Sequence, residues 1–414
     1  YRGAGRPIMS AMLERLVNAA AIEMKLDPAE LRRRNMIPPE KFPYSLSNGY
    51  IYDSGDPRAV LADALKAAKW DDKAAFERRR TEAKVRGKLL GRGIATAIEP
   101  TGAGNFADNV DVEFGGDGQI NLFAVSHSSG QGHETAFAEV VQRILGVPLG
   151  SIKLHEGDRQ RRVIGNPSGG SRSMHGVGSA LHVASWEIVK KGMPLAAQSL
   201  EAAEGDLEFS NGKYHIKGTD RSVGFGEVAR RYAGPGKHPL DTKAENKSGS
   251  TYPNGAHIAE VEIDVDTGEV AVTAYLACDD AGTIINHTLV EGQMHGGLAQ
   301  GIGQVLGEHM IYDRAGQLLT GTYMDYTMPR AGILPAQGVT LLDHPIPTPT
   351  NPLGAKGVGE SGVTGSLPTV MNAILDALAP VGVTHLDMPA SSSRVWAAMQ
   401  AAKAGKPSAM AVEQ

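Results

Sequence analysis

Four glycine-rich stretches, each running into an apolar segment with helical spacing, constrain this fold more than any other feature. They precede or contain residues 136–145, 182–191, 291–308 and 367–378. Glycine makes up 51 of the 414 residues, without a low-complexity tract. Glycine permits positive φ and close backbone approach. We therefore interpret each stretch as a tight loop that leads into a helix.

Such loops predict the kind of ligand. The N-terminus of a helix presents free backbone N–H groups and the positive end of the helix dipole, which suits an anion. One loop of this kind is most often only a turn, but four favour an extended anionic ligand with phosphates. The sequence has no G-x-x-x-x-G-K-[ST] motif and no strand–G-x-G-x-x-G–helix at dinucleotide spacing. ATP and NAD are therefore poor candidates.

The remaining pattern predicts an α+β fold with strands and helices in mixed order. We expect helix over residues 10–35, with an apolar stripe, and a second short helix from Asp27-Pro28 to Arg34. A hairpin is predicted over 256–278, turning at Asp-Thr-Gly, and Pro368 suits the first turn of the last helix. The residues assigned to the stripe are Leu13, Leu16, Val17, Ala20 and Ala21.

Composition shifts suggest a division into segments. We expect a helix-rich segment at 1–88 that continues from a missing N-terminal half, and two cofactor-binding subdomains at 89–250 and 251–400. Residues 401–414 are predicted to form a flexible tail. The chain begins at Tyr1 without a Met or a signal-peptide pattern, so we expect a processed subunit or a fragment of a longer protein.

Composition also excludes several classes of protein. The net charge is −5 and no long basic run suggests nucleic-acid binding. No apolar run reaches the roughly 18 residues of a membrane helix. The single cysteine, Cys278, excludes an intrachain disulfide framework and an intrachain cysteine-ligated Fe–S cluster.

Two familiar catalytic motifs are broken. His133-Glu134 begins like H-E-x-x-H, but Phe137 stands at the second ligand position of that zinc motif. Ser361 follows Glu360 in a Gly-Glu-Ser-Gly sequence, which is not a G-x-S-x-G nucleophile elbow. A carboxylate such as Glu360, inside a glycine loop, is either exposed to solvent or directed at a ligand.

The motifs, taken in order, are similar to those of one family. The chain resembles the C-terminal half of the molybdenum-binding large subunit of the xanthine dehydrogenase / aerobic carbon monoxide dehydrogenase family of molybdenum hydroxylases. The resemblance covers residues 1 to about 399. The motifs that carry it are Tyr1–Pro7, Gly130–Thr135, Gly169–Ser173, Glu291-Gly292-Gln293 with Gly296-Gly297, Asp325-Tyr326 and Gly354–Glu360.

The resemblance implies an α+β molybdopterin-binding domain and a molybdopterin cofactor, with a cytosine dinucleotide extension in most bacterial members. The pterin sulfurs hold the molybdenum, so no direct protein ligand to the metal is expected, and Gln131 and Glu360 would stand near it. The residues implied to contact the cofactor are Gly130, Gln131, Gly132, His133, Glu134, Gly170, Ser171, Arg172, Cys278, Asp279, Asn286, Gln293, Lys356, Gly357, Val358 and Gly359.

The resemblance implies two catalytic residues. Glu360 would be the general base that takes a proton from a water-derived group at the metal, a task that needs a carboxylate within hydrogen-bond reach in a dry pocket. Arg2 would stand beside the metal and orient a substrate carbonyl or stabilise charge on a heterocycle. A packing or backbone-capping role for Arg2 is equally open.

One departure bears on the substrate. Carbon monoxide dehydrogenases of this family carry a copper-binding cysteine in the loop that corresponds to residues 1–7, and this loop contains none. We therefore expect oxidation of an N-heterocycle or an aldehyde, and disfavour carbon monoxide. The family also implies partners: the N-terminal half of the large subunit, a 2Fe–2S subunit and an FAD subunit, with dimerisation of the assembly.

Two other functions stay open. One is a degenerate paralogue that keeps the fold as a binding or structural subunit. The other is an enzyme that acts on a phosphate-containing ligand and uses Glu360 as a base without molybdenum. We expect a cytoplasmic location, with membrane association only through partners.

Overall fold

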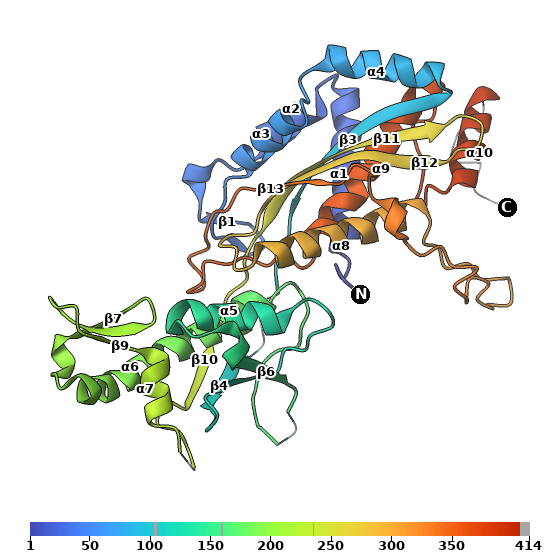
Figure 1. Ribbon diagram of the computed structural model, residues 1–414. Coiled ribbons are helices and arrows are strands. Elements are labelled where there is room, and N and C mark those ends of the chain that lie inside the picture. Colours follow the sequence, from blue (N-terminus) through green and yellow to red (C-terminus); the bar gives the residue numbers. More distant parts are fainter. Residues whose placement is uncertain (103–105, 159, 235, 406–414) are drawn as a thin grey trace.

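The computed structural model describes residues 1–102, 106–158, 160–234 and 236–405 (Figure 1). Helices and strands alternate in mixed order, and the ribbon forms two lobes; the chain passes to the second lobe after β3 and returns to the first after β10. The predicted α+β class is confirmed. Within the described residues, no helix combines the length and apolar character that a bilayer crossing requires.

The first lobe is built on a mixed sheet with the strand order β13-β12-β11-β3. The predicted hairpin is confirmed as β11 and β12, which pair antiparallel, and its turn contains Gly268 at φ 73°. The parallel strand β13 pairs with β12, and β3 with the other edge of β11. The strands are β3 (Lys88–Ile98), β11 (Asn254–Asp264), β12 (Val270–Asp280) and β13 (Thr340–Asp343).

Helices cover both faces of this sheet. The apolar helix α9 (Ser361–Leu378) lies against β3 and β11 and is almost wholly buried. Gly91 and Gly93 of β3 make this possible, since a Cβ at either would collide with the α9 backbone. On the other face, α3 contributes buried Val60, Leu61 and Leu65. The helices of this lobe are α1 (Arg6–Glu23), α2 (Pro28–Asn35), α3 (Pro57–Ala67), α4 (Lys73–Val85), α8 (His287–Leu306), α9 and α10 (Ser392–Lys403).

The second lobe surrounds a sheet with the order β10-β4-β5-β6. Helices α5 and α6 share its core, where Phe137, Val140 and Val141 of α5 are buried as their helical spacing predicts. A small sheet of β7, β8 and β9 packs beside α6 (Figure 1). The elements are β4 (Asp108–Phe114), β5 (Ile120–Ala124), α5 (His133–Leu145), β6 (Ile152–Glu156), α6 (Ser179–Leu200), β7 (Leu207–Ser210), β8 (Lys213–Ile216), β9 (Ser222–Gly224), α7 (Phe225–Arg231) and β10 (Thr242–Asn246); β1 (Tyr44–Ser45) and β2 (Ile51–Tyr52) pair apart from both lobes' sheets.

The predicted apolar stripe of α1 was wrong for its large residues, although Ala21 is buried. Leu13 and Leu16 are 58% and 67% exposed, and the buried face carries Pro7, Ala11, Glu14 and Ala21. The small residues let α1 lie close to α9, and the buried Glu14 accepts a hydrogen bond of 2.7 Å from Arg32 Nε. Large apolar side chains on the opposite face are thereby left on the surface.

Two predicted helix starts were also wrong. The last helix begins at Ser361, so Pro368 lies inside α9 rather than in its first turn. Residues 291–306 are not a loop followed by a helix, because α8 already begins at His287 and includes the glycines. A Cβ on Gly297 would stand 2.8 Å from Val363 N of α9. These glycines serve close contact between two helices.

The division into segments can be compared with the sheets. Strand β3 shares a sheet with β11 and β12, so residues 88–98 pack with the later segment. The boundaries at 88/89 and 250/251 remain a proposal. Of the proposed flexible tail, residues 401–403 belong to α10 and residues 406–414 lie outside the described residues.

Candidate active site

The predicted loops meet around one cavity of about 570 Å³. Its lining comes from four parts of the chain, at 129–137, 168–174, 281–293 and 355–360, together with Arg2. The first turns of α5 and α8 and the π-helical turn Met174–Gly178 border it. The sequence predicts one extended ligand for these loops, and only the tertiary structure could bring together segments so far apart in the chain.

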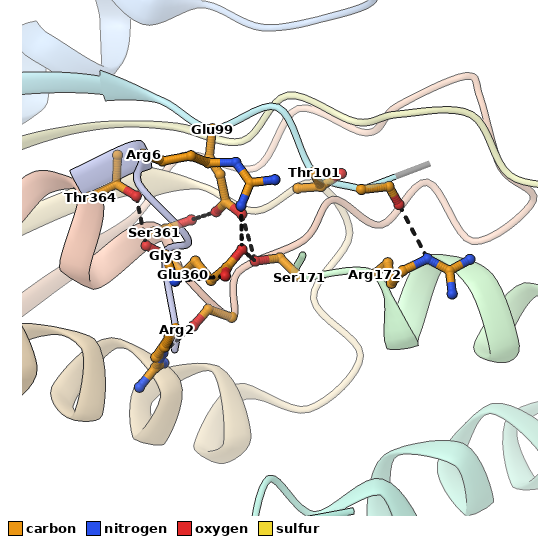
Figure 2. Close-up of polar contacts among 12 residues, drawn as sticks. Arg2, Gly3, Arg6, Glu99, Thr101, Ser171, Arg172, Glu360, Ser361 and Thr364 are labelled. Carbon is orange, nitrogen blue, oxygen red and sulfur yellow. Dashed lines mark hydrogen bonds and ion pairs between the residues drawn. The ribbon is translucent and has the colours of Figure 1, made fainter. Parts of the chain in front are cut away.

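Glu360 lies at the edge of this cavity as the residue immediately before α9 (Figure 2). Its side chain is held on both oxygens. Gly3 N donates to Oε1 at 2.7 Å, and Arg6 Nη1 lies 2.7 Å from Oε2. The residue is only 7% exposed. Glu360 is therefore a buried, oriented carboxylate and not a solvent-exposed loop acid.

A second carboxyl group, Glu99, lies beside Glu360 and was missed by sequence reasoning (Figure 2). It follows the last residue of β3 and is 2% exposed. Burial, then the nearby Glu360, raises the pKa of Glu99 from 4.5 to about 8. The available signal was an acid placed directly after the apolar strand sequence GIATAI.

Lys356 occupies the other end of the same loop. Its Nζ lies 2.6 Å from Asp280 Oδ2, with both side chains fully buried, and it also donates to Ser54 O. The pair joins the loop to the end of β12. Lys356 borders the cavity, but its charge is balanced within the protein.

Arg2 also borders the cavity, and its guanidinium caps backbone groups. Nε donates to Gly359 O, and Nη2 donates to Gln293 O at 2.7 Å and to Gln293 Oε1 at 3.1 Å. Arg2 thus ties the first residues to α8 and to the Glu360 loop. Of the two roles left open by the sequence, this geometry shows the backbone-capping one.

Gln131 and His133 also line the cavity, just before α5 and at its first residue. Gln131 Nε2 donates to Ser168 Oγ at 3.0 Å, which connects two glycine loops. His133 Nδ1 contacts Glu156 Oε1 at 2.9 Å, and its ring stacks on Phe137. The histidine of the broken zinc motif is therefore a buried packing group that still faces the cavity.

The glycine loop before the π-helical turn contains a strained residue. Ser171 has φ 58°, although it is not glycine, and Gly170 has φ 63°. Arg172 forms a buried ion pair, Nη2 to Asp108 Oδ2 at 2.8 Å. Both Ser171 and Arg172 border the cavity, and a contact of Arg172 with an anion remains a prediction.

The other predicted contacts divide into two groups. Asn286 lines the cavity and caps α8, accepting from Leu289 N at 2.9 Å. Gly130, Gly170, Gln293, Gly357, Val358 and Gly359 also line it. In the part of the chain that the structure describes, Gly132, Glu134, Cys278 and Asp279 lie outside the lining.

The residues outside the lining have structural reasons for their positions. Gly132 has φ 74°, and a Cβ there would stand 2.7 Å from Leu289. Glu134 is on the exposed face of α5. Cys278 is fully buried in the core of the sheet, and burial raises the pKa of its thiol to about 12. Asp279 Oδ2 contacts His257 Nε2 at 3.1 Å.

The chain also matches known protein families. A model described as a molybdopterin cofactor-binding domain matches residues 63–335, and a second model of the same description matches residues 1–36. The chain belongs to this molybdopterin-binding family. The resemblance to large subunits of molybdenum hydroxylases is thereby confirmed.

Individual relatives of this family agree with the assignment. The chain is 35% identical over 406 residues to the carbon monoxide dehydrogenase large chain of Hydrogenophaga pseudoflava, covering 94% of this chain and 50% of that protein. It is 34% identical to the nicotine 6-hydroxylase large subunit of Paenarthrobacter nicotinovorans, covering 95% and 50%. The carbon monoxide dehydrogenase structure from Oligotropha carboxidovorans superposes with a TM-score of 0.89 at 32% identity, covering 97% and 52%. The chain thus spans about half the length of these relatives.

The residues present fit molybdopterin, the cofactor of this family. Helix N-termini at the cavity suit a phosphate. Gly130 and Gly169, at φ 101° and 158°, have free space where a Cβ would stand, so their backbone is open to a ligand. In the described residues, no cluster of three His, Cys, Asp or Glu side chains could hold a metal ion. The dithiolene sulfurs of the cofactor itself would hold the metal in place of protein ligands.

Proposed function

We propose that this chain is the molybdopterin-binding C-terminal portion of the large subunit of a molybdenum hydroxylase. The whole enzyme oxidatively hydroxylates an N-heterocycle or an aldehyde, with oxygen derived from water. The observation that carries the proposal is Glu360: a buried carboxylate, held by Gly3 and Arg6, at a cavity lined by the family's glycine loops.

The cofactor in this proposal is molybdopterin in its cytosine dinucleotide form. When bound, it supplies a molybdenum centre that accepts the electrons of the oxidised substrate. The chain's own residues bind and orient it. Backbone N–H groups before α5 and around Gly170 meet its phosphates, and the Gln131 amide offers both a donor and an acceptor.

Glu360 is the general base in this proposal. Gly3 N and Arg6 orient the carboxylate, and its burial keeps bulk water from competing for the proton. Arg2 holds the backbone carbonyl of Gly359 and so fixes the position of the Glu360 loop. In this arrangement Arg2 acts by positioning the base, and its contact with a substrate is the less supported alternative.

The substrate class rests on the first loop. Residues 1–7 contain no cysteine, and Cys278 is buried in the sheet with a thiol pKa of about 12, so it is unsuited to bind copper at the cavity. Overall sequence identity does not discriminate between the two substrate classes, since a carbon monoxide dehydrogenase and a nicotine hydroxylase match at 35% and 34%. The loop favours the hydroxylase of a heterocycle or aldehyde over carbon monoxide oxidation.

The proposal includes partners. The relatives have twice the length of this chain, and one is a subunit of a dehydrogenase complex. We infer that an N-terminal half completes the site and that a 2Fe–2S subunit and an FAD subunit carry electrons onward, in a dimer of such assemblies. The cytoplasm is the proposed compartment, with membrane association only through partners.

Elemental analysis of the natively purified complex tests the proposal. We expect about one Mo per copy of this chain, Fe from the partner, and no Cu, together with turnover of an N-heterocycle or aldehyde. Stoichiometric Cu with carbon monoxide oxidation would support the disfavoured alternative. Mo without turnover in a broad substrate screen would indicate an inactive paralogue. Absence of both Mo and pterin, with the N-terminal half present, would overturn the cofactor assignment.

A further inference from the structure

Glu99 is a buried acid with no role in the function proposed above. Its Oε1 accepts a hydrogen bond from Ser171 Oγ at 2.6 Å, and its Oε2 accepts one from Ser361 Oγ at 3.2 Å. Ser171 borders the cavity, and Ser361 is the first residue of α9, next to Glu360. Within the described residues, the ion pair at this site goes from Arg6 to Glu360, and none goes to Glu99. A buried carboxyl group without a cation favours its neutral form.

Ser171 connects this acid to Glu360. Its hydroxyl lies 2.6 Å from Glu99 Oε1 and 3.3 Å from Glu360 Oε2, so one side chain bridges the two carboxyl groups (Figure 2). The backbone of Ser171 is held in a strained conformation, φ 58°, to place it there. Such strain persists only where the surroundings enforce it. Here Gly102 N donates to Gly170 O at 2.7 Å, and Ser171 O lies where a Cβ of Gly357 would be.

The single hydroxyl proton of Ser171 makes the two acids interdependent. If Glu99 is ionised, the shorter contact directs that proton to Glu99 and leaves Glu360 without it. If Glu99 is protonated, its own O–H can donate to Ser171 Oγ, and Ser171 can then donate to Glu360 Oε2. The protonation state of Glu99 therefore decides whether Glu360 receives this third donor besides Gly3 and Arg6.

We propose that Glu99 is a positioning residue for Glu360: in its protonated form it directs the Ser171 hydroxyl onto the catalytic carboxylate. This inference rests on the proposed role of Glu360 as the base. The charged groups facing Glu99 are Glu360, which favours its protonated form, and Arg6 from α1 and Arg2, which oppose it.

The pH dependence of turnover in the native complex is the first test. Because Glu99 loses its proton at a pKa of about 8, wild-type kcat should fall as the pH rises through that value. Glu99→Gln keeps an amide donor for Ser171 at every pH, so this fall should be absent. At pH 7 the kcat of Glu99→Gln should be only several-fold below that of the wild type. Glu113→Gln is the matched control. Glu113 lies in β4 of the second lobe, where it pairs with Arg161, and this variant should keep the wild-type pH profile.

A second variant and a second readout keep the test decisive. Ser171→Gly removes the bridging hydroxyl while tolerating φ 58°, and it should also abolish the fall near pH 8 at unchanged Mo content. Infrared difference spectra of the same complexes report the protonated carboxyl group directly. The wild type and Ser171→Gly should show its C=O band at pH 7, and Glu99→Gln should lack it.

The readouts separate this inference from the proposed function. An identical alkaline limb in wild type and Glu99→Gln, or a carboxyl band that persists in Glu99→Gln, would overturn the role of Glu99. If the wild-type complex has no turnover at all, the proposed function fails. The infrared band then still reports whether Glu99 is protonated, and its absence from the wild type at pH 7 would overturn this inference as well.

Discussion

Two glycine-rich regions that look alike in the sequence differ in what their glycines do. In residues 354–360, glycines form a loop whose two charged side chains, Lys356 and Glu360, meet very different surroundings. In α8, residues 287–306, the glycines stay helical and bring the helix against α9. A high glycine content therefore marks close approach of the backbone to something, either a ligand or another helix, and does not by itself indicate a loop.

The two charged residues of the 354–360 loop differ from each other in the same way. Lys356 is paired with one buried acid and its charge is neutralised, so it anchors the loop. Glu360 stands near a second acid, Glu99, and shares a serine with it. One end of the loop is electrostatically satisfied, and the other retains a group able to exchange a proton.

The largest expected effect is on catalysis at the Glu360 end. Glu360→Gln keeps the size of the side chain but cannot accept the proton, so kcat should fall by about 10²–10⁴-fold. The measurement is steady-state turnover of the native complex at matched Mo content. Glu134→Gln, on the exposed face of α5, is the control and should stay within twofold of wild type, roughly as surface changes do. Near-normal turnover of Glu360→Gln would remove Glu360 from the mechanism.

A large loss of stability is expected at the Lys356 end. Lys356→Met preserves the side-chain length but leaves Asp280 charged and unpaired in a fully buried position. Breaking a buried pair costs roughly 3–5 kcal/mol in the free energy of unfolding. Lys190→Ala breaks an exposed pair with Glu187 and should cost at most about 1 kcal/mol. Denaturant unfolding of both variants would measure the difference, and equal losses would contradict the anchoring role.

A smaller effect should distinguish the glycines of α8. In Gly297→Ala, the added methyl would stand 2.8 Å from Val363 N and 2.9 Å from Gly362 Cα, both backbone atoms. We expect a loss of about 1–3 kcal/mol from overpacking. Gly292→Ala, in the same helix with open space around it, should gain up to about 1 kcal/mol in helix propensity. A stable Gly297→Ala would mean that α8 and α9 can separate at little cost.

The last comparison concerns the pH dependence of stability that Glu99 imposes. Its pKa is raised from 4.5 to about 8, so the folded chain holds a proton that the unfolded chain releases over this range. This contribution to stability is complete below pH 4.5 and is lost as the pH rises through about 8. Glu99→Gln, without this loss, should melt at least about 2 °C above wild type at pH 8 and closer to it at pH 5. Parallel melting curves at both pH values would contradict the shifted pKa.

Much of the fold followed from local pattern. The alternation of β11 and β12 around Asp-Thr-Gly and the helical spacing of Phe137, Val140 and Val141 identified these elements correctly, because such periods reflect which face is buried. The stripe of α1 could not be predicted in this way. Its large apolar residues are exposed, and its small ones pack against α9, so the buried face depended on a partner helix far along the chain.

The sequence by itself determined the family, the glycine loops and Glu360, because these depend on short motifs whose order survives in the chain. Only the tertiary structure decided what surrounds them. It placed Gly3, Arg6, Ser171 and Glu99 around one carboxylate, although Gly3 and Glu360 are 357 positions apart. It also placed Cys278 and Glu134 away from the cavity. The physical reason is that the proton affinity and accessibility of a side chain depend on burial and on neighbours in space, which the order of residues does not reveal.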